Sequence, residues 1–303
     1  MKNPLLKNPH LSERGAYLLL VLAVLFWAGN WIVGKALAPL VPPAALTFWR
    51  WAIALALIAP VVAPRLWASR EVIRRHWRPI ALLGLLGGGL HNVLQYWGLQ
   101  YTAAINGPLL NSLTPVFIIV LGALFFGEPL RPRTVVGASV ALCGALAIIT
   151  RLDPQVVLGL SFNTGDLLII LSLLMLAGYT IALRWRPEGL DALTFLACFA
   201  LVAELPVGLA ALAEYAGGAR IVLNATSIAG IAYVAVFPAL LAYHFWNLGV
   251  ATLGSARAGV FMYLLPFFGS LLGVTLLGER FGLHHAVGIG LIISGVSLAT
   301  RRR

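Results

Sequence analysis

Polar side chains lie at helical spacing inside long apolar stretches of this 303-residue chain. Asn92 and Tyr96 are four residues apart and share one helix face, and Tyr243 and Asn247 repeat this spacing with phenol and amide exchanged. Polar groups inside apolar helices generally face other helices or a cavity and avoid lipid. Two interpretations fit the pattern: opposed walls that hydrogen-bond the polar end of a solute, or hydrogen bonds that join neighbouring helices.

Further aromatic and polar residues extend this candidate binding surface. Together they indicate a cavity with aromatic faces and a few amides, which suits an amphipathic zwitterion or a flat ring better than a highly charged phosphate. For each residue alone, packing in the protein core explains its presence at least as well. The predicted substrate-binding residues are Trp27, Asn30, His91, Asn92, Gln95, Tyr96, Asn111, Tyr179, Tyr243, Asn247 and Tyr263.

Ionisable residues inside the apolar stretches are rare, and each has two explanations. Glu204 lies near the centre of its stretch, where an acidic residue costs about 3 kcal/mol on insertion. It is either a proton-coupling group or a structural carboxyl bonded within the bundle. Arg50 either extends to the outer edge of the membrane or binds a carboxylate. We expect Glu128 and Glu279 to cap the helix that follows each of them.

Two prolines occupy equivalent places near the middle of apolar stretches. Pro115 and Pro266 each remove a backbone donor and clash with the preceding helical turn. Carbonyl groups freed at such a kink can line a cavity. The pair is therefore interpreted as hinges or cavity-lining bends, with a static kink that improves packing as the alternative.

The composition indicates that these residues lie in a lipid membrane. Hydrophobic residues make up 60% of the chain and charged residues 10%, and the mean hydropathy is +0.93, whereas soluble domains carry about 25% charged residues. The predicted fold is an all-α integral membrane protein, because lipid offers the backbone no hydrogen-bond partners. The ten predicted transmembrane helices span residues 15–38, 43–64, 79–99, 104–126, 133–150, 163–184, 193–213, 226–248, 256–277 and 284–300.

The net charge of +11 is distributed unevenly. If both termini lie in the cytoplasm, most of the 21 basic residues lie on that side, as the positive-inside rule requires. We therefore expect a multi-pass protein of the cell inner membrane with cytoplasmic termini and no nucleic-acid partner. The run from Gly29 to Lys35 has the spacing of a nucleotide-binding loop, but Ala36 replaces its Ser or Thr and the run lies in an apolar helix. No cofactor is expected.

The chain is a duplication. Pro115, Gly127, Glu128, Gly137 and Gly144 each recur as the same residue type 151 positions later. Each half has five predicted spans, an odd number, so the second half enters the membrane from the opposite side. Such inverted repeats can exchange conformations around one site. The predicted repeats are residues 15–151, with the first five spans, and residues 163–301, with the last five.

Three motifs resemble those of the EamA-type transporters of the drug/metabolite transporter superfamily. They are Phe26-Trp27-Ala28-Gly29-Asn30, Thr47-Phe48-Trp49-Arg50, and the paired blocks Leu113-Thr114-Pro115 to Gly127-Glu128 and Leu264-Leu265-Pro266 to Gly278-Glu279. The resemblance covers nearly the whole chain and implies a ten-helix secondary transporter with a central cavity. The layout is also similar to that of the YddG-type aromatic amino-acid exporters, although no signature specifies the substrate.

We therefore expect a secondary transporter that exports small metabolites, with aromatic or other neutral amino acids as the first candidates, by alternating access. Import or exchange of another metabolite, such as a nucleoside, sugar or vitamin, is the alternative. A membrane enzyme or a passive pore is a weaker one, because the sequence shows no catalytic residues and no metal ligands. The expected partners are a small-molecule substrate and the lipid bilayer, with proton coupling through Glu204 as an open question. Oligomeric state does not follow from the sequence.

Overall fold

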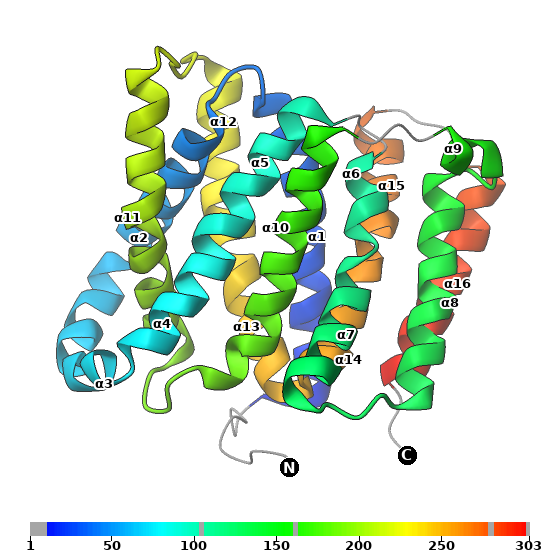
Figure 1. Cartoon of the computed structure of the whole chain (residues 1–303), viewed down its shortest axis with the longest axis horizontal. Helices are drawn as coiled ribbons and strands as arrows, with labels where there is room; N and C mark the ends of the chain where they lie inside the picture. The colour runs from blue at the N-terminus through cyan, green and yellow to red at the C-terminus, as the bar shows by residue number, and fades with distance from the viewer. Residues whose placement is uncertain (1–10, 103–105, 160–162, 278–281, 301–303) are drawn as a thin grey trace.

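The computed structural model describes residues 11–102, 106–159, 163–277 and 282–300. All regular structure in these ranges is helical, and the helices stand side by side in one bundle (Figure 1). The first half contains α1 (Glu13–Leu37), α2 (Pro43–Ala68), α3 (Arg70–Arg75), α4 (Trp77–Leu83), a π-helical segment (Gly84–Leu90), α5 (His91–Tyr101), α6 (Asn106–Asn111), α7 (Thr114–Phe126), α8 (Pro132–Ile149) and α9 (Pro154–Leu158).

The second half repeats this order from the other side of the bundle. It contains α10 (Thr164–Ala182), a 3₁₀ turn (Leu183–Trp185), α11 (Ala192–Ala216), α12 (Ala225–Val234), a π-helical segment (Ala235–Leu241), α13 (Ala242–Leu253), α14 (Ser255–Gly259), a 3₁₀ turn (Val260–Tyr263), α15 (Leu264–Leu277) and α16 (Leu283–Thr300).

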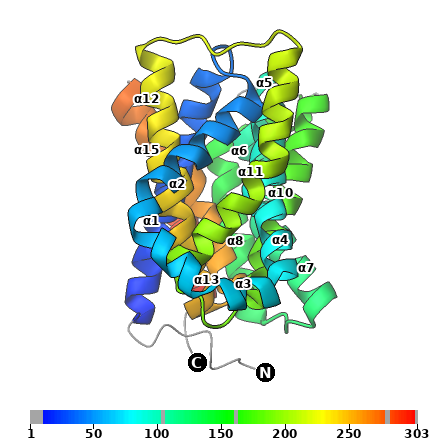
Figure 2. The ribbon, with the colours of Figure 1, turned by 90° about the vertical axis from the view of Figure 1, so that its left-hand side faces the viewer.

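The bundle has two distinct ends. We call the end where α1 begins and α16 ends the near end, and the opposite end the far end (Figures 1 and 2). At the near end, Arg257 Nη2 donates to Tyr17 Oη at 2.5 Å and to the carbonyl of Thr300 at 2.6 Å. These bonds tie the first helix, the last helix and α14 together. The α1–α2 and α11–α12 connections lie at the far end (Figure 2).

The expectation of an all-α membrane fold is confirmed. Within the described residues, nine helices are long and apolar enough to cross a membrane. The remaining predicted span is a continuous helical stretch from α4 through the π-helical segment to α5. It is less apolar than the other nine because His91, Asn92 and Gln95 lie in it.

The two halves interleave and do not form separate layers. The strongest helix contacts pair α1 with α13, α10 with α5, α2 with α11 and α8 with α16, so each joins one half to the other. The first pair and the second pair exchange under the repeat, and the last two pairs map onto themselves. This pattern requires a pseudo-twofold axis, as inverted repeats have.

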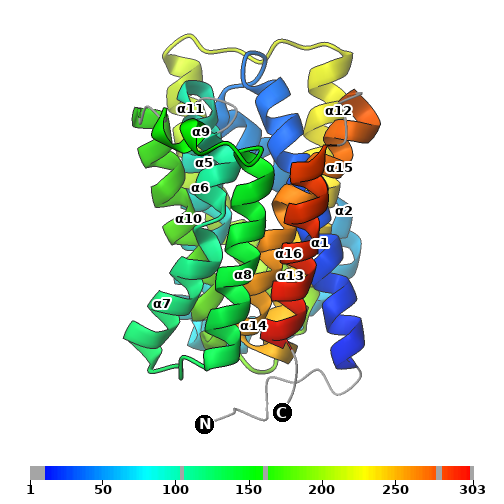
Figure 3. The same cartoon turned by 90° about the vertical axis from the view of Figure 1, so that its right-hand side faces the viewer.

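The contact between α8 and α16 shows the symmetry in detail (Figure 3). A Cβ atom added at Gly137 would lie 2.6 Å from the carbonyl oxygen of Gly295, and one at Gly144 would lie 2.6 Å from that of Gly288. The residue numbers of the contacting glycines rise along α8 while they fall along α16, so the two helices are antiparallel. Only glycine allows two helix backbones to approach this closely inside a membrane.

This contact predicts a difference between two glycines of α16. A Cβ at Gly288 would lie against Ile148 Cγ1 and 2.6 Å from the carbonyl oxygen of Gly144, whereas one at Gly290 would meet nothing within 4 Å. Gly288→Ala should cost about 1–3 kcal/mol through overpacking and lower the melting temperature of the detergent-purified protein. Gly290→Ala should leave it unchanged or slightly higher. Equal effects of the two substitutions would contradict the packing described.

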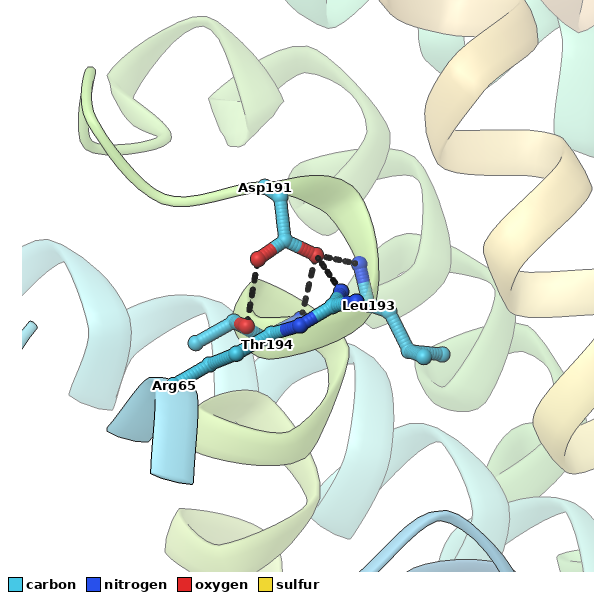
Figure 4. A network of polar contacts seen from close by, with 4 residues as sticks. All are labelled: Arg65, Asp191, Leu193 and Thr194. Carbon is cyan, nitrogen blue, oxygen red and sulfur yellow. Dashed lines mark hydrogen bonds and ion pairs between the residues drawn. The ribbon is translucent and has the colours of Figure 1, made fainter. Parts of the chain in front are cut away.

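A second near-end contact joins α2 to the start of α11 (Figure 4). Asp191 accepts hydrogen bonds from the backbone amides of Leu193 and Thr194, both at 3.1 Å, and from Thr194 Oγ1 at 2.5 Å. Arg65 Nη1 lies 3.4 Å from the same carboxylate. Partial burial opposes ionisation, but the bonds from Thr194 and Leu193 and the charge of Arg65 outweigh it, so the pKa of Asp191 lies below its usual value.

The lowered pKa predicts how the contribution of Asp191 to stability changes with pH. A carboxylate whose pKa is depressed by folding stabilises the protein fully above its unfolded pKa of about 3.9, and the contribution disappears as the pH falls through the lower folded value. Asparagine also caps helices well, so Asp191→Asn removes the charge more than the cap. It should lower the melting temperature at pH 7 by the equivalent of about 0.2–1 kcal/mol, and this difference should vanish toward pH 3. Asp153→Asn is the control, because Asp153 is exposed and contacts only the local amide of Gln155. A difference that grows in acid would contradict the assignment.

Candidate functional site

Two π-helical segments lie at the centre of the bundle, where their backbone carbonyls accept hydrogen bonds from side chains. They span Gly84–Leu90 and Ala235–Leu241, and the second lies 151 positions after the first. Such a segment changes the regular pattern of backbone hydrogen bonds, and lipid cannot satisfy a carbonyl that is released. Here the carbonyls of Gly87, Gly88 and Pro238 accept hydrogen bonds from side chains of other helices or of the following turn.

Asn92 and Tyr243 meet at the pseudo-twofold axis. Asn92 Nδ2 lies 2.9 Å from the carbonyl of Gly87, 3.0 Å from that of Gly88 and 3.2 Å from Tyr243 Oη. Tyr243 Oη in turn donates to the Gly87 carbonyl at 2.5 Å. The two side chains are 151 positions apart in the sequence and are both buried. Because they are repeat equivalents in direct contact, the axis passes between them.

A tyrosine and an asparagine are bonded in each half. Tyr96 Oη donates to Asn30 Oδ1 at 2.8 Å in the first half, and Tyr179 Oη donates to Asn247 Oδ1 in the second. Asn30 is the equivalent of Tyr179, and Tyr96 that of Asn247, so the same bond occurs twice with its residue types exchanged. In this conformation the amides and phenols join helices to one another. Their binding of a solute stays a prediction.

Arg50 of α2 completes this centre. Its Nη1 donates to Asn92 Oδ1 at 2.7 Å and to Tyr96 Oη at 2.8 Å. The residue is 1% exposed, so it does not extend to the membrane edge. The sequence left this residue between two explanations and outside the predicted binding set. Its place in the Thr-Phe-Trp-Arg motif, inside an apolar stretch, was the available signal.

Aromatic rings surround the polar centre. The Trp27 ring centroid lies 5.5 Å from that of Tyr243 and 5.1 Å from that of Trp246, and Trp27 Nε1 donates to the Pro238 carbonyl at 3.2 Å. The Trp51 ring lies 5.3 Å from the Tyr243 ring, and its Nε1 donates to the Gly88 carbonyl at 2.9 Å. The structure thus brings Trp27 to the centre as expected. Trp51 and Trp246 were missed by the sequence analysis.

Four other predicted residues lie apart from this network. His91 Nδ1 contacts Ser172 of α10, at 3.0 Å from its carbonyl and 2.8 Å from its hydroxyl, and so joins two helices. Gln95 is buried on the same helix. Asn111 Nδ2 and Tyr263 Oη are buried without a hydrogen-bond partner in the described part of the chain. Their donors are available to a ligand or water.

The two prolines mark helix starts and do not kink continuous helices. The span that contains Pro115 is broken between α6 and α7, and Pro115 occupies the first turn of α7. Pro266 lies in the first turn of α15, after the 3₁₀ turn that follows α14. Proline is well tolerated there because the first amides of a helix lack intrahelical partners. Both breaks occur at equivalent places, and their role as hinges stays a prediction.

Glu204 lies on α11, and both of its carboxylate oxygens are buried without a hydrogen-bond partner in the described ranges. The structure therefore does not provide the bonded carboxyl that one interpretation expected. Its role in proton coupling stays a prediction. In the same ranges, no group of three or more His, Cys, Asp or Glu side chains could hold a metal ion.

A pocket of about 510 Å³ opens at the far end. Its wall includes the α1–α2 connection, the end of α5 at Trp97 and Gln100, and the end of α11 at Glu214. Glu214 accepts hydrogen bonds from the amides of Ala44 and Ala45 at the start of α2, both at 3.0 Å, and from Trp97 Nε1 at 3.1 Å. One carboxylate thus holds α2, α5 and α11 together beside the pocket.

Glu128 links the two halves at the near end. Its carboxylate accepts hydrogen bonds from Arg184, after α10, and from Ser255 Oγ, at the start of α14, at 3.0 and 3.1 Å. The expectation that Glu128 caps α8 was wrong: the cap position of α8 is Arg131, without a side-chain hydrogen bond, and the Glu128 side chain turns toward the second half. Glu279 lies outside the described residues.

Inverted halves interleaved around a buried polar centre define an α-helical membrane protein of the inverted-repeat class, an architecture that many secondary transporters share. A family model described as the EamA-like transporter family matches residues 14–150 and again residues 163–301. The chain belongs to this family, which confirms the expectation of a transporter and not an enzyme.

Relatives and a solved structure agree. An uncharacterized transporter of Archaeoglobus fulgidus is 27% identical over 95% of this chain and 98% of its own. A probable terminal-alkyne amino-acid exporter of Streptantibioticus cattleyicolor is 28% identical over 93% of this chain and 92% of its own. A crystal structure of a protein, 22% identical, matches with a TM-score of 0.76 over 95% of this chain and 97% of that chain, which shows a shared fold.

The hydrogen bonds at the axis predict a specific cost for losing one hydroxyl. Tyr243→Phe keeps the ring but leaves the Gly87 carbonyl and Asn92 without that partner. The expected loss is about 1–3 kcal/mol, seen as a lower melting temperature in detergent. Tyr215→Phe is the control, because its exposed hydroxyl only receives a 3.4 Å bond from Trp49 and should change little. If both substitutions act alike, the axis bonds do not stabilise the bundle.

Proposed function

We propose that the protein exports small metabolites, and amino acids in the first place, across the cell inner membrane by alternating access. The observation that carries this proposal is the contact of Asn92 with its repeat equivalent Tyr243 in the middle of the bundle. A polar centre shared by two inverted halves can be opened to either side when the halves exchange conformations. The family membership supports a transporter, and the proposal adds substrate class, direction and mechanism.

The two ends of the bundle support alternating access. Glu128, Arg184 and Ser255 link α7 of the first half to α10 and α14 of the second at the near end, which closes it. The far end carries the pocket beside Trp97. The conformation described is therefore closed at the near end and partly open at the far end. Export requires the reverse state, in which the near-end bonds break.

The charge distribution supports export from the near end. Of the described basic residues, Lys35, Arg151 and Arg220 belong to the far end and Arg50 to the centre. The others lie at the near end, in α1, α2, α3, α4, the start of α8, α14 and the turns after α7 and α10. By the positive-inside rule the near end then faces the cytoplasm.

The side chains at the centre of the bundle support amino acids as the substrate class. Amides, phenols and a guanidinium lie within a ring of indole and phenol faces at the centre, which suits a small molecule with one apolar part and one polar, charged part. The Streptantibioticus cattleyicolor relative, whose name is probable terminal-alkyne amino-acid exporter, adds support for amino-acid export. Aromatic amino acids are the first candidates, because aromatic rings in edge-to-face and tilted contacts already surround the centre.

Counterflow in proteoliposomes tests this function. Vesicles loaded with one unlabelled compound are offered the labelled compound, for amino acids, nucleosides and sugars in turn. We expect saturable uptake of at least one amino acid and at least a tenfold loss of its rate in Asn92→Ala and Asn247→Ala, since one lost hydrogen bond to a charged ligand is worth about 1.5–3 kcal/mol. Tyr215→Phe should transport normally.

Three results would count against the proposal. Flux that never saturates would indicate a pore, and saturable transport of only nucleosides or sugars would exclude amino acids. Arg70 lies in the near-end helix α3. If a cysteine that replaces it reacts with a membrane-impermeant thiol reagent on intact cells, the near end faces the outside and the proposed orientation is wrong.

A further inference from the structure

Arg50 is a buried cation that forms no ion pair with any residue the structure describes. It is 1% exposed. The ion pairs of the described residues join Arg65 to Asp191, Arg184 to Glu128 and Arg257 to Glu13, and none of them includes Arg50. The groups that Arg50 contacts, the Asn92 amide and the Tyr96 phenol, carry no charge. A charge held inside a bundle in lipid is costly and usually marks a function.

One edge of the guanidinium is unused. Both hydrogen bonds of Arg50 are made by Nη1, at 2.7 Å to Asn92 Oδ1 and 2.8 Å to Tyr96 Oη. Nε is buried without a partner in the described part of the chain, and no bond of Nη2 is found there either. Nε and Nη2 form the edge of an arginine that donates side by side to the two oxygens of a carboxylate.

The surrounding side chains hold this edge in a fixed orientation. The Arg50 guanidinium carbon lies 5.5 Å from the Trp51 ring centroid and 5.8 Å from that of Tyr96. Trp51 is itself fixed by its bond to the Gly88 carbonyl, and Tyr96 by its bond to Asn30. A donor pair that is already oriented loses little entropy when an anion arrives.

The far-end pocket shares helix α5 with the site around Arg50. Its wall includes Trp97, the residue after Tyr96 on α5, whose indole is held by Glu214. Arg50 is not part of the pocket wall, so the site is occluded in this conformation. An anion can reach Arg50 only after α5, or a helix that packs against α5, has moved.

We propose that Arg50 is the receptor for the carboxylate group of the transported solute, bound side by side to Nε and Nη2. The inference rests on the proposed transport function and narrows its substrates to small molecules with a free carboxylate. Asn92 and Tyr96 position the guanidinium through Nη1, and the solute supplies the charge that the bundle lacks.

Acid and amide pairs test the proposal directly. The probes are L-phenylalanine, L-leucine and L-methionine, each compared with its carboxamide, by titration of the melting temperature of the purified protein. At least one acid should bind the wild type at least about 30-fold more tightly than its amide, because a buried charge pair that loses one partner weakens binding to that degree. Arg50→Lys and Arg50→Gln should lose this preference and leave amide binding unchanged.

A third variant keeps the test decisive if the Arg50 variants fail to fold. Asn92→Asp places a carboxylate next to Nη1, at the position of the 2.7 Å contact. The substitution also removes the donations of Asn92 Nδ2 to the Gly87 and Gly88 carbonyls, so the melting temperature should fall, while the internal ion pair weakens acid binding to the same extent. A purely structural role for Arg50 predicts no change in acid binding. Arg65→Gln is the matched control, since it removes an arginine from an exposed ion pair.

The outcomes separate the two proposals. Saturable transport with equal binding of acids and amides would overturn the role of Arg50 and leave the transport function intact. The role of Arg50 is likewise overturned if Arg50→Lys, Arg50→Gln and Asn92→Asp all keep the wild-type preference for acids. Absence of saturable transport of every amino acid tried, together with absence of binding, would overturn both.

Discussion

Backbone groups inside a membrane must find their partners within the protein, and the centre of this bundle is organised around that requirement. The π-helical segments at Gly84–Leu90 and Ala235–Leu241 release carbonyl groups where the two halves meet. Indole, phenol and amide donors from surrounding helices occupy those carbonyls. The hydrogen bonds that join the two halves at the centre are thus the same bonds that pair these backbone carbonyls. A rearrangement that separates the halves there requires that water or solute replaces them.

The duplication produces a symmetric scaffold with an asymmetric centre. Helix pairs exchange under the axis, and the tyrosine–asparagine bond recurs with its residue types reversed. Arg50 has no charged counterpart, because the aligned position 147 residues later is Ala197. A scaffold of equal halves allows two states of similar energy, whereas a solute with distinct ends needs a site with distinct sides. Because different side chains occupy equivalent positions of the two halves, the site has distinct sides although the helices around it are equivalent.

Helical spacing and repeat offset predicted most of the scaffold. The offset of 151 gave the inverted halves, and the four-residue spacing placed Asn92 with Tyr96 and Tyr243 with Asn247 on shared faces. Spacing says which face of a helix a residue occupies, but it does not say which other helix lies against that face. For this reason the contact between Asn92 and Tyr243, the burial of Arg50 and the turn of Glu128 toward Arg184 could not be derived. The separation of His91 from the centre has the same cause.

The glycine seam between α8 and α16 has a mechanical consequence. The pseudo-twofold axis maps the contact of Gly144 with Gly288 onto that of Gly295 with Gly137, so the seam is its own image. When the halves trade conformations, the contacts of α1 with α13 and of α10 with α5 exchange, whereas this one, like the contact of α2 with α11, can persist unaltered. Helices α8 and α16 can then stay in place while the remaining helices rock about them. The glycines of the seam fix the position of this pivot.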